Sequence, residues 1–411
     1  MRVVITGIGL LSPIGCNIVD FHEGLRSGRS GIRLIKNFNV DDIPSKIAGQ
    51  VRNFDPHEFF SGKELKYMDR FSQLGLAAAT MACEDGDLLD KGYNHQDTAV
   101  YMGTGIGGIV TYEDVFEDLK ATGREVKSSA YIIPKIMNNA ASSVIAAHHG
   151  MKGTNYTINT ACSSGGNAIG QAFRDIRDGR NRMILCGGAE APITRGLLKA
   201  WSKMHVLSRY NEHPAEASRP FDKNRDGFVL AEGSAVFILE SIESARQRGA
   251  RIHAEIIGFA SNCNADHLTA PALSGQVLAM QAAIEDAGIE SEDIDYINAH
   301  GTATKMNDKV ETETCKEVFG NHAYNIPISS TKSMIGHAMG ASSAIEFLAA
   351  VLAVKHDFLP PTINFQTPDP DCDLDYVPNQ ARTQEVNIAL SNSFAFGGSN
   401  AILVVKKWMS N

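Results

Sequence analysis

The stretch Thr160-Ala161-Cys162-Ser163-Ser164-Gly165-Gly166 joins an extended segment to an amphipathic helix. The preceding residues 155–158 have the composition of a strand. Beyond the glycines, one helical face is charged and the other carries apolar side chains, at Ile169, Ala172, Phe173 and Ile176. Amides at a helix N-terminus stabilise a thiolate, so we expect a lowered pKa and a nucleophilic sulfur at Cys162. The alternative is a small core residue.

Short apolar runs rich in β-branched residues alternate with helical patterns along the chain. We predict strands at residues 3–6, 98–102, 156–158, 183–186, 235–240, 254–259, 296–299, 326–329, 388–391 and 401–405. Strands separated by helices need crossover connections, which are typical of sheets covered by helices on both faces. The sequence therefore predicts an α/β fold.

The order of these segments repeats once. The strand, Cys162 and helix of the first half correspond to a strand, Lys332-Ser333-Met334-Ile335-Gly336-His337 and a helix in the second. Similarly, residues 183–188 with their glycine pair correspond to residues 388–398. We therefore predict two similar halves, 1–250 with the thiol and 251–411 with two candidate histidines, packed as one body.

Composition restricts the kind of protein. The 411 residues are 43% hydrophobic and carry a formal net charge of -9, which argues against nucleic acid as the main ligand. The seven cysteines lack CxxC spacing, so we expect neither disulfides nor a structural zinc, and a reducing cytoplasm. Residues 1–9 look like a first core strand and not a signal peptide. No continuous apolar run of about 18 residues predicts a membrane span.

Two histidines have a local sequence setting similar to that of Cys162. Both lie next to small residues at the ends of predicted strands. His300 lies in Asn298-Ala299-His300-Gly301-Thr302-Ala303-Thr304, and His337 lies in Gly336-His337-Ala338-Met339-Gly340, at the start of a helix. Loops at the carboxyl ends of parallel strands meet at one edge of a sheet. We therefore predict one site containing the thiol and both imidazoles, although a single histidine is more often structural.

The helix after His337 should be buried on nearly all sides, because Glu346 is the only charge in residues 341–354. A buried carboxylate needs a partner or a proton, and Lys332 is the predicted partner. A purely structural ion pair is the alternative.

The turn near the end of the chain has the sequence Phe394-Ala395-Phe396-Gly397-Gly398-Ser399-Asn400. It can expose amides that stabilise an oxyanion, or it can be a plain hairpin.

Two motifs resemble ligand sites but lack the required context. Gly103-Thr104-Gly105-Ile106-Gly107-Gly108 matches a dinucleotide fingerprint, but the helical pattern after it is poor. Asp222-Lys223-Asn224-Arg225-Asp226-Gly227 resembles the start of a calcium loop, but glycine occupies the bidentate position. We predict an ion-paired turn there and no metal site.

Taken together, these segments resemble the type II β-ketoacyl-acyl carrier protein synthases, which are thiolase-fold condensing enzymes. The resemblance extends over the whole chain. Its most specific parts are Thr160–Ser164, Ala217-Ser218-Arg219-Pro220-Phe221-Asp222, Asn298–Thr304 and the segment from Ser330 to His337. It implies a duplicated, five-layered αβαβα architecture with two mixed sheets and buried central helices.

The resemblance also implies roles for individual residues. Cys162 would carry the acyl chain, His300 and His337 would hydrogen-bond the malonyl thioester oxygen, and Lys332 and Glu346 would support them. Phe396 would act as a gate, and its amide and that of Cys162 would form a second oxyanion hole. Thr302 and Thr304 would hold the pantetheine arm, and Ile106 would line the acyl pocket. The other implied substrate-binding positions are Thr269, Trp201, Phe394 and Gly397.

Some positions depart from the family pattern. Ala303 and Lys305 stand where serine and proline are common, and Ala395 replaces a glycine beside the gate. Trp201 stands where a smaller aromatic is expected, and His205 where an arginine often contacts the carrier. The remaining candidates for carrier docking are Lys63, Lys66, Arg70, Arg124 and Lys127. An ordinary solvated surface is the alternative for these charges.

The implied reaction is decarboxylative condensation of malonyl-acyl carrier protein with an acyl chain, in fatty acid elongation by a homodimer. The alternative is the ketosynthase subunit of a type II polyketide system, paired with a chain-length-factor subunit. A thiolase is disfavoured because no second cysteine lies between Phe394 and Asn400, and a non-catalytic subunit because all three reactive residues are present. The partner would be acyl carrier protein, whose phosphopantetheine carries the substrates, with no cofactor bound by the enzyme itself.

Overall fold

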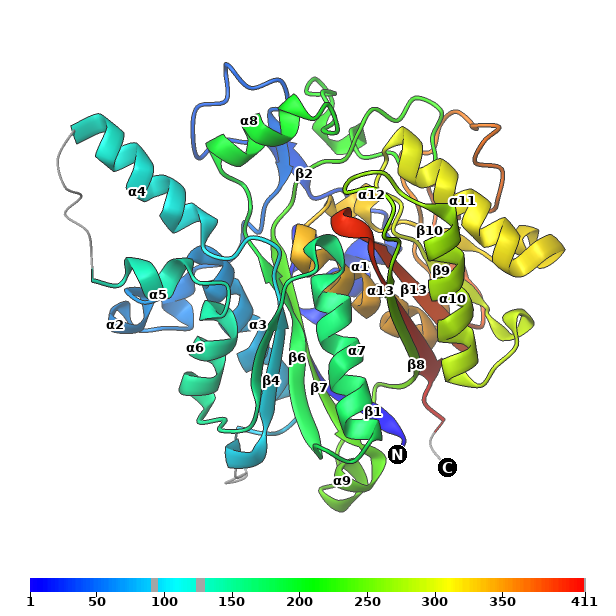
Figure 1. Cartoon of the computed structure of the whole chain (residues 1–411), viewed down its shortest axis with the longest axis horizontal. Coiled ribbons are helices and arrows are strands. Elements are labelled where there is room, and N and C mark those ends of the chain that lie inside the picture. The colour runs from blue at the N-terminus through cyan, green and yellow to red at the C-terminus, as the bar shows by residue number, and fades with distance from the viewer. Residues whose placement is uncertain (90–94, 123–129, 410–411) are drawn as a thin grey trace.

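A computed structural model describes residues 1–89, 95–122 and 130–409. Ten strands form one sheet in the order β10-β9-β13-β14-β8-β1-β7-β6-β4-β5 (Figure 1). Their bounds are β1 Val3–Leu11, β4 Ala99–Gly103, β5 Asn155–Ile158, β6 Met183–Glu190, β7 Gly233–Ser241, β8 Ala254–Cys263, β9 Tyr296–Asn298, β10 Ile328–Ser329, β13 Ile388–Phe394 and β14 Ser399–Lys407. The short strands β2 Ile32–Leu34 and β3 Ile47–Gly49 pair with each other, as do β11 Phe358–Leu359 and β12 Arg382–Thr383. All ten predicted strands are confirmed.

The sheet consists of two five-stranded halves with the same topology. When the five strands of each half are numbered along the chain, their order in space is third, second, fourth, fifth and first. This order is β5-β4-β6-β7-β1 in the first half and β10-β9-β13-β14-β8 in the second. The pairings agree as well, parallel among the first three of each order and antiparallel among the rest. The halves join where residues 3–5 of β1 pair antiparallel with residues 254–256 of β8. The predicted mixed sheets are thus linked at one edge.

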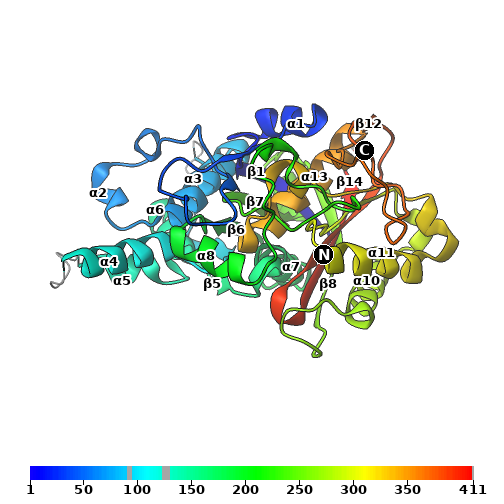
Figure 2. The ribbon, with the colours of Figure 1, turned by 90° about the horizontal axis from the view of Figure 1, so that it is seen from above.

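Helices form three layers around these sheets. The α-helices of the described residues are α1 Ile18–Arg26, α2 Gly62–Leu65, α3 Arg70–Asp85, α4 Ile109–Thr122, α5 Ile132–Ile136, α6 Ala140–His149, α7 Ser164–Arg177, α8 Arg195–Lys203, α9 Ile242–Gln247, α10 Leu273–Ala287, α11 Lys305–Phe319, α12 Lys332–Ile335 and α13 Ser342–His356. Between the halves, α7 packs on β4 and β6, α13 packs on β9 and β13, and the two helices touch. On the outer faces, α3 covers β1 and α10 covers β8 (Figure 2). The αβαβα architecture is confirmed.

The central helix α13 is buried along nearly its whole length, as its composition predicts. Within the described residues, Met339–His356 is long and apolar enough to cross a membrane, with a mean hydropathy of 1.2, but 89% of this segment is buried inside the protein. Small residues let α7 approach it closely. A Cβ at Gly165 would lie 2.9 Å from the Cβ of Ala344. This contact brings the start of α7, and therefore Cys162, next to the start of α13.

Two local predictions have different outcomes. A helix, α4, does follow Gly103–Gly108, so the prediction of a poor helical segment was wrong. This helix packs mainly against α5 and extends from the body of the protein (Figure 1), so it has no continuous buried face and little apolar periodicity. The turn at Asp222 is ion-paired as predicted, because buried Arg225 contacts Asp308 at 3.5 Å and Asp369 at 2.5 Å.

Candidate active site

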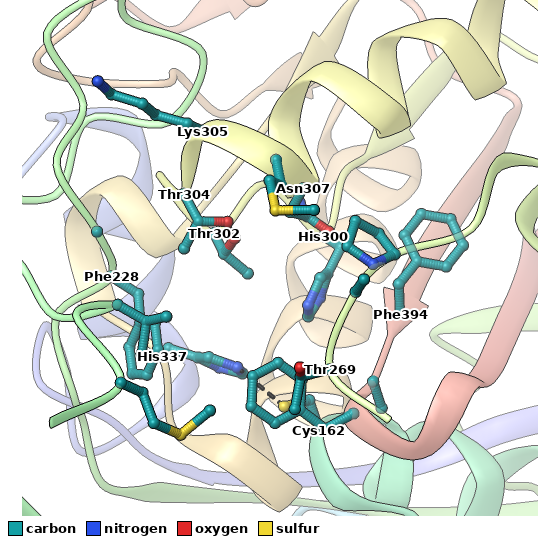
Figure 3. A pocket seen from close by; sticks show the side chains of 18 of the residues that line it. Cys162, Phe228, Thr269, His300, Thr302, Thr304, Lys305, Asn307, His337 and Phe394 are labelled. Atoms are coloured by element: carbon teal, nitrogen blue, oxygen red, sulfur yellow. Dashed lines mark hydrogen bonds between the residues drawn. The ribbon is translucent and has the colours of Figure 1, made fainter. Parts of the chain in front are cut away.

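A cavity of about 710 Å³ brings the predicted nucleophile and both histidines together (Figure 3). The side chains of Cys162, His300 and His337 point toward a common space. Most of the predicted substrate-binding residues also line it, namely Trp201, Thr269, Thr302, Thr304 and Phe394, as does the predicted gate Phe396. Segments separated by more than two hundred residues therefore form one site, because the loops at the ends of both half-sheets meet here.

Cys162 lies in a short 3₁₀ turn, Ala161–Ser163, that leads directly into α7. Its Sγ lies 3.1 Å from Nε2 of His337, and the residue is only 6% exposed. Burial raises the pKa of the Cys162 thiol to about 12, although the charge of Lys332 and the N–H of Phe396, which contacts the sulfur, act to lower it. The predicted lowering of this pKa was therefore wrong. Loss of water outweighs the helix terminus, and the resting group is a thiol.

The two histidines come from loops of the second half. His300 follows β9, and His337 lies between α12 and α13, with the ring centroids 5.5 Å apart. Burial, followed by the nearby charge of Lys332, lowers the pKa of both imidazoles well below the usual value. Both rings are therefore neutral, and each has one donor and one acceptor nitrogen.

Lys332 fixes the orientation of His300 and is paired with the buried carboxylate predicted for it. Its Nζ lies 3.2 Å from Nδ1 of His300, 2.5 Å from the carbonyl oxygen of His300 and 2.5 Å from Oε1 of Glu346. Burial raises the pKa of Glu346 to about 7, and Lys332 acts in the opposite direction. Because the ammonium can only donate, Nδ1 of His300 accepts, and the ring hydrogen lies on Nε2.

The backbone of His300 is held by Glu311, which the sequence did not single out for this position. The N–H groups of His300 and Gly301 donate to its two carboxylate oxygens, both at 2.7 Å. Burial raises the pKa of Glu311 to about 7, against the effect of these two donors. Glu311 is on α11, eleven residues after His300, a spacing that no local motif would identify.

The turn after β13 places the N–H of Phe396 at the sulfur and contributes the Phe396 ring to the cavity wall. Gly397 and Gly398 adopt φ values of 80° and 76°, which are favourable only for glycine, and the N–H of Gly397 donates to the carbonyl oxygen of Leu268 at 2.7 Å. The ring of Phe396 lies 5.7 Å from that of Trp201, between centroids. Gly397 is exposed, so the turn forms one wall of the cavity mainly through the residues before it.

The outer part of the cavity is more polar. The hydroxyl oxygens of Thr302 and Thr304 lie 2.9 Å apart, and exposed Lys305 extends away from the sulfur (Figure 3). Thr269 is exposed on the facing loop. Ile106 does not line this cavity; its N–H donates to the buried carboxylate of Glu190 at 3.2 Å.

The predicted docking residues differ in their surroundings. Lys63 and Lys66, in and after α2, are exposed. Arg70 is not free to dock, because its guanidinium makes two 2.7 Å hydrogen bonds to Glu232 and is partly buried, which corrects the prediction for this residue. Arg124 and Lys127 lie outside the described residues. At the cavity mouth, Nδ1 of exposed His205 accepts a hydrogen bond from the guanidinium of Arg209 at 2.9 Å.

No group of three or more histidine, cysteine, aspartate or glutamate side chains in the described part of the chain could hold a metal ion. The fold and the position of the thiol together place the chain among the thiolase-fold condensing enzymes. A narrower assignment follows from known sequences. Residues 1–245 match the model described as Beta-ketoacyl synthase, N-terminal domain, and residues 253–366 match Beta-ketoacyl synthase, C-terminal domain. The chain belongs to the β-ketoacyl synthase family.

Full-length relatives agree with this assignment. The chain is 46% identical to a 3-oxoacyl-[acyl-carrier-protein] synthase 2 of Synechocystis sp., covering 99% of this chain and 98% of the relative. It is 41% identical to the protein of the same name from Coxiella burnetii, with the same coverage. Among solved structures, the ishigamide ketosynthase/chain length factor is similar with a TM-score of 0.94 and 38% identity, covering 99% of both chains.

Proposed function

We propose that this chain extends acyl chains by decarboxylative Claisen condensation. Malonyl-acyl carrier protein loses CO₂ and joins an acyl group held as a thioester on Cys162, which gives β-ketoacyl-acyl carrier protein. The observation that carries the proposal is the 3.1 Å approach of His337 Nε2 to the sulfur, in the cavity that also contains His300. The names of the curated relatives, at 41% to 46% identity, favour fatty acid elongation.

The first half-reaction loads the enzyme. The sulfur of Cys162 attacks the thioester carbonyl of the acyl carrier, the bond from that carbonyl to the carrier sulfur breaks, and the thiol proton ends on the carrier. The N–H groups of Phe396 and Cys162 donate to the carbonyl oxygen as it becomes an oxyanion. The contact between the Phe396 N–H and Sγ supports this role, because it places the donor beside the reacting atom.

The second half-reaction forms the carbon–carbon bond. The bond between the malonyl methylene and its carboxylate breaks, CO₂ leaves, and the electron pair passes to an enolate. Its oxygen accepts hydrogen bonds from Nε2 of His300 and His337, which stabilise the developing charge. The carbanion then attacks the acyl carbonyl, the bond from that carbon to Cys162 breaks with its electron pair on sulfur, and the sulfur takes up one proton from water to return to the thiol. Lys332 and Glu346 keep His300 in the donor state throughout.

The remaining cavity residues bind the substrate arm and chain. Thr302 and Thr304, with Thr269 opposite, hydrogen-bond the neutral pantetheine arm. Phe396 is the gate between the pantetheine arm and the acyl chain, and it hinges at Gly397. The rings of Trp201 and Phe394 pack against the bound substrate. Ile106 contributes to the acyl pocket from outside this cavity. The substrates arrive on the phosphopantetheine of the carrier, and the enzyme itself binds no cofactor.

The two halves, 1–250 with the nucleophile and 251–411 with both histidines, act as one rigid body in a cytoplasmic homodimer. Support for one body comes from the core between the sheets, to which both halves contribute. A heterodimer with a chain-length-factor subunit is the second candidate, favoured by the 38% identity to the ishigamide ketosynthase/chain length factor.

The purified chain should convert acyl-carrier and malonyl-carrier into β-ketoacyl-carrier without any other protein. Mass spectrometry of the carrier measures the product, and sedimentation measures the oligomeric state. Condensation that starts only after addition of a related subunit would favour the heterodimer. The enzymatic proposal would be contradicted if Cys162 carried no acyl adduct, both in the chain alone and after addition of the related subunit.

Docking is tested by reversing charge at the exposed lysines. The double variant Lys63→Glu, Lys66→Glu should raise KM for carrier-bound substrates about tenfold, because it places like charge against an acidic carrier. Activity with a carrier-free acyl thioester should not change. Lys152→Glu is the matched control, since Lys152 is exposed and precedes β5 at the end of the strand away from Cys162. An equal effect of both changes would contradict docking at this surface.

A further inference from the structure

His337 has two ring nitrogens, and each faces a different partner. Nε2 lies 3.1 Å from Sγ of Cys162, while Nδ1 lies 2.8 Å from Oγ of Ser342, the first residue of α13. Ser342 is completely buried, and its oxygen also accepts a hydrogen bond from the N–H of Ala338 at 2.8 Å. No sequence motif points to this serine, which contacts the imidazole at the start of the helix.

The ring of His337 is neutral, because burial and the charge of Lys332 lower its pKa well below the usual value. A neutral imidazole donates from one nitrogen and accepts at the other. Nε2 faces the cavity, so the position of the ring hydrogen, on Nε2 or on Nδ1, decides what His337 can do there. With hydrogen on Nε2 it stabilises negative charge; with hydrogen on Nδ1 it presents a lone pair to the sulfur and the substrate.

The single hydrogen of the Ser342 hydroxyl selects between these states. Oγ already accepts from Ala338, and within the described residues it has no other hydrogen-bond partner than Nδ1 of His337. If Nδ1 carried the ring hydrogen, the buried hydroxyl hydrogen would have no acceptor, which is unfavourable. All groups are satisfied when Oγ–H donates to Nδ1 and the ring hydrogen lies on Nε2.

We propose that Ser342 is a positioning residue that keeps the His337 hydrogen on Nε2, so that His337 donates into the cavity and is not the base that takes the Cys162 proton. The effect of this tautomer on catalysis rests on the proposed function. With the other tautomer, the Nε2 lone pair would repel the enolate oxygen that forms as CO₂ leaves.

The two histidines would then be held in the same state by different groups. Lys332 holds His300 with a cation that can only donate, at 3.2 Å from Nδ1. Ser342 holds His337 with one neutral hydrogen bond, at 2.8 Å. A hydroxyl can also accept, so the state of His337 depends on how all neighbours of Oγ are satisfied. Removing the hydroxyl should therefore affect His337 and leave His300 unchanged.

The tautomer can be measured without any assay of activity. In full-length protein labelled with ¹⁵N at histidine, long-range ¹H–¹⁵N spectra separate protonated from unprotonated ring nitrogens, and the His337→Asn variant identifies the signal. We expect a protonated Nε2 in the unchanged protein. Ser342→Ala should shift the tautomer ratio about tenfold toward protonated Nδ1, the effect of one lost hydrogen bond. A protonated Nδ1 in the unchanged protein would overturn the inference even if the variant does not fold.

Ser343→Ala is the matched control. Ser343 is the next residue, is equally buried, and its Oγ accepts from the N–H of Gly166 at 2.8 Å without touching a histidine. Its loss should leave the tautomer of His337 unchanged. Equal tautomer ratios in the two variants would overturn the proposed role of Ser342.

The catalytic consequence has its own measurement. Ser342→Ala should release CO₂ from malonyl-carrier about tenfold more slowly than Ser343→Ala, with KM unchanged, because the lost donor acts on developing charge. A shifted tautomer with an unchanged rate would overturn this part of the inference. If the unchanged protein shows the expected tautomer but no condensation, the proposed function fails, while the structural role of Ser342 is supported.

Discussion

Changing Cys162 to glutamine should reduce condensation by about 10⁴-fold or more while release of CO₂ from malonyl-carrier continues. The acyl group is held only through a bond to sulfur, so no acyl-enzyme forms without it. Decarboxylation instead needs hydrogen-bond donors at the thioester oxygen, and His300 and His337 remain in the variant. The glutamine amide should lie near the Phe396 N–H, where the acyl thioester carbonyl would otherwise lie.

Two measurements on the same preparation separate these steps. Labelled malonyl-carrier gives the rate of CO₂ release, and mass spectrometry gives the β-ketoacyl product and the acyl adduct. The control is Cys263→Ser, because Cys263 is an exposed cysteine outside any disulfide, and serine can still donate to the carbonyl oxygen of Gly397 that its thiol contacts at 3.4 Å. That variant should keep both steps and the adduct on Cys162. Loss of CO₂ release in a correctly folded glutamine variant would contradict the proposed division of roles.

The strands of this fold could be predicted because their side chains are buried on both faces, which leaves continuous apolar runs in the sequence. Their bounds could not, because pairing depends on distant partners. The apolar run predicted a strand that ends at Thr6, but β1 continues along β7 to Leu11, through two glycines that lie outside that run. At Gly9 a Cβ would lie 1.8 Å from the carbonyl oxygen of Ala78 in α3, so the strand can continue only with glycine there. The fold class follows from local pattern, and the extent of each strand from packing.

The electrostatics could not be predicted from sequence, because burial is a property of the whole fold. The position of Cys162 before a helix suggested a low pKa, but the surrounding cavity reverses the direction. Similarly, Arg70 was a plausible docking cation until the fold brought Glu232, 162 residues later in the chain, against its guanidinium. Lys332 and Glu346 were the exception, since a single charge in an apolar helix requires a nearby partner.

Changing His300 to alanine should slow CO₂ release from malonyl-carrier at least about 100-fold, which corresponds to about 3 kcal/mol of lost transition-state stabilisation. The Nε2 donor disappears just where the enolate charge develops, and His337 alone remains at that oxygen. His337→Ala should have a comparable effect for the same reason. Acylation of Cys162 should persist better than decarboxylation in His300→Ala, because acyl transfer depends on the Phe396 N–H.

The comparison must separate lost chemistry from lost structure. His300 also accepts from Lys332, so its removal leaves the ammonium with Glu346 and one fewer partner, and thermal unfolding should be measured beside the rates. His57→Ala, at an exposed residue outside the cavity, controls for the loss of an imidazole as such. If both imidazoles donate to one oxygen, loss of either should slow CO₂ release per folded molecule. If they are purely structural, their loss should lower stability and leave that rate unchanged. Near-normal CO₂ release from folded His300→Ala would therefore remove His300 from the mechanism.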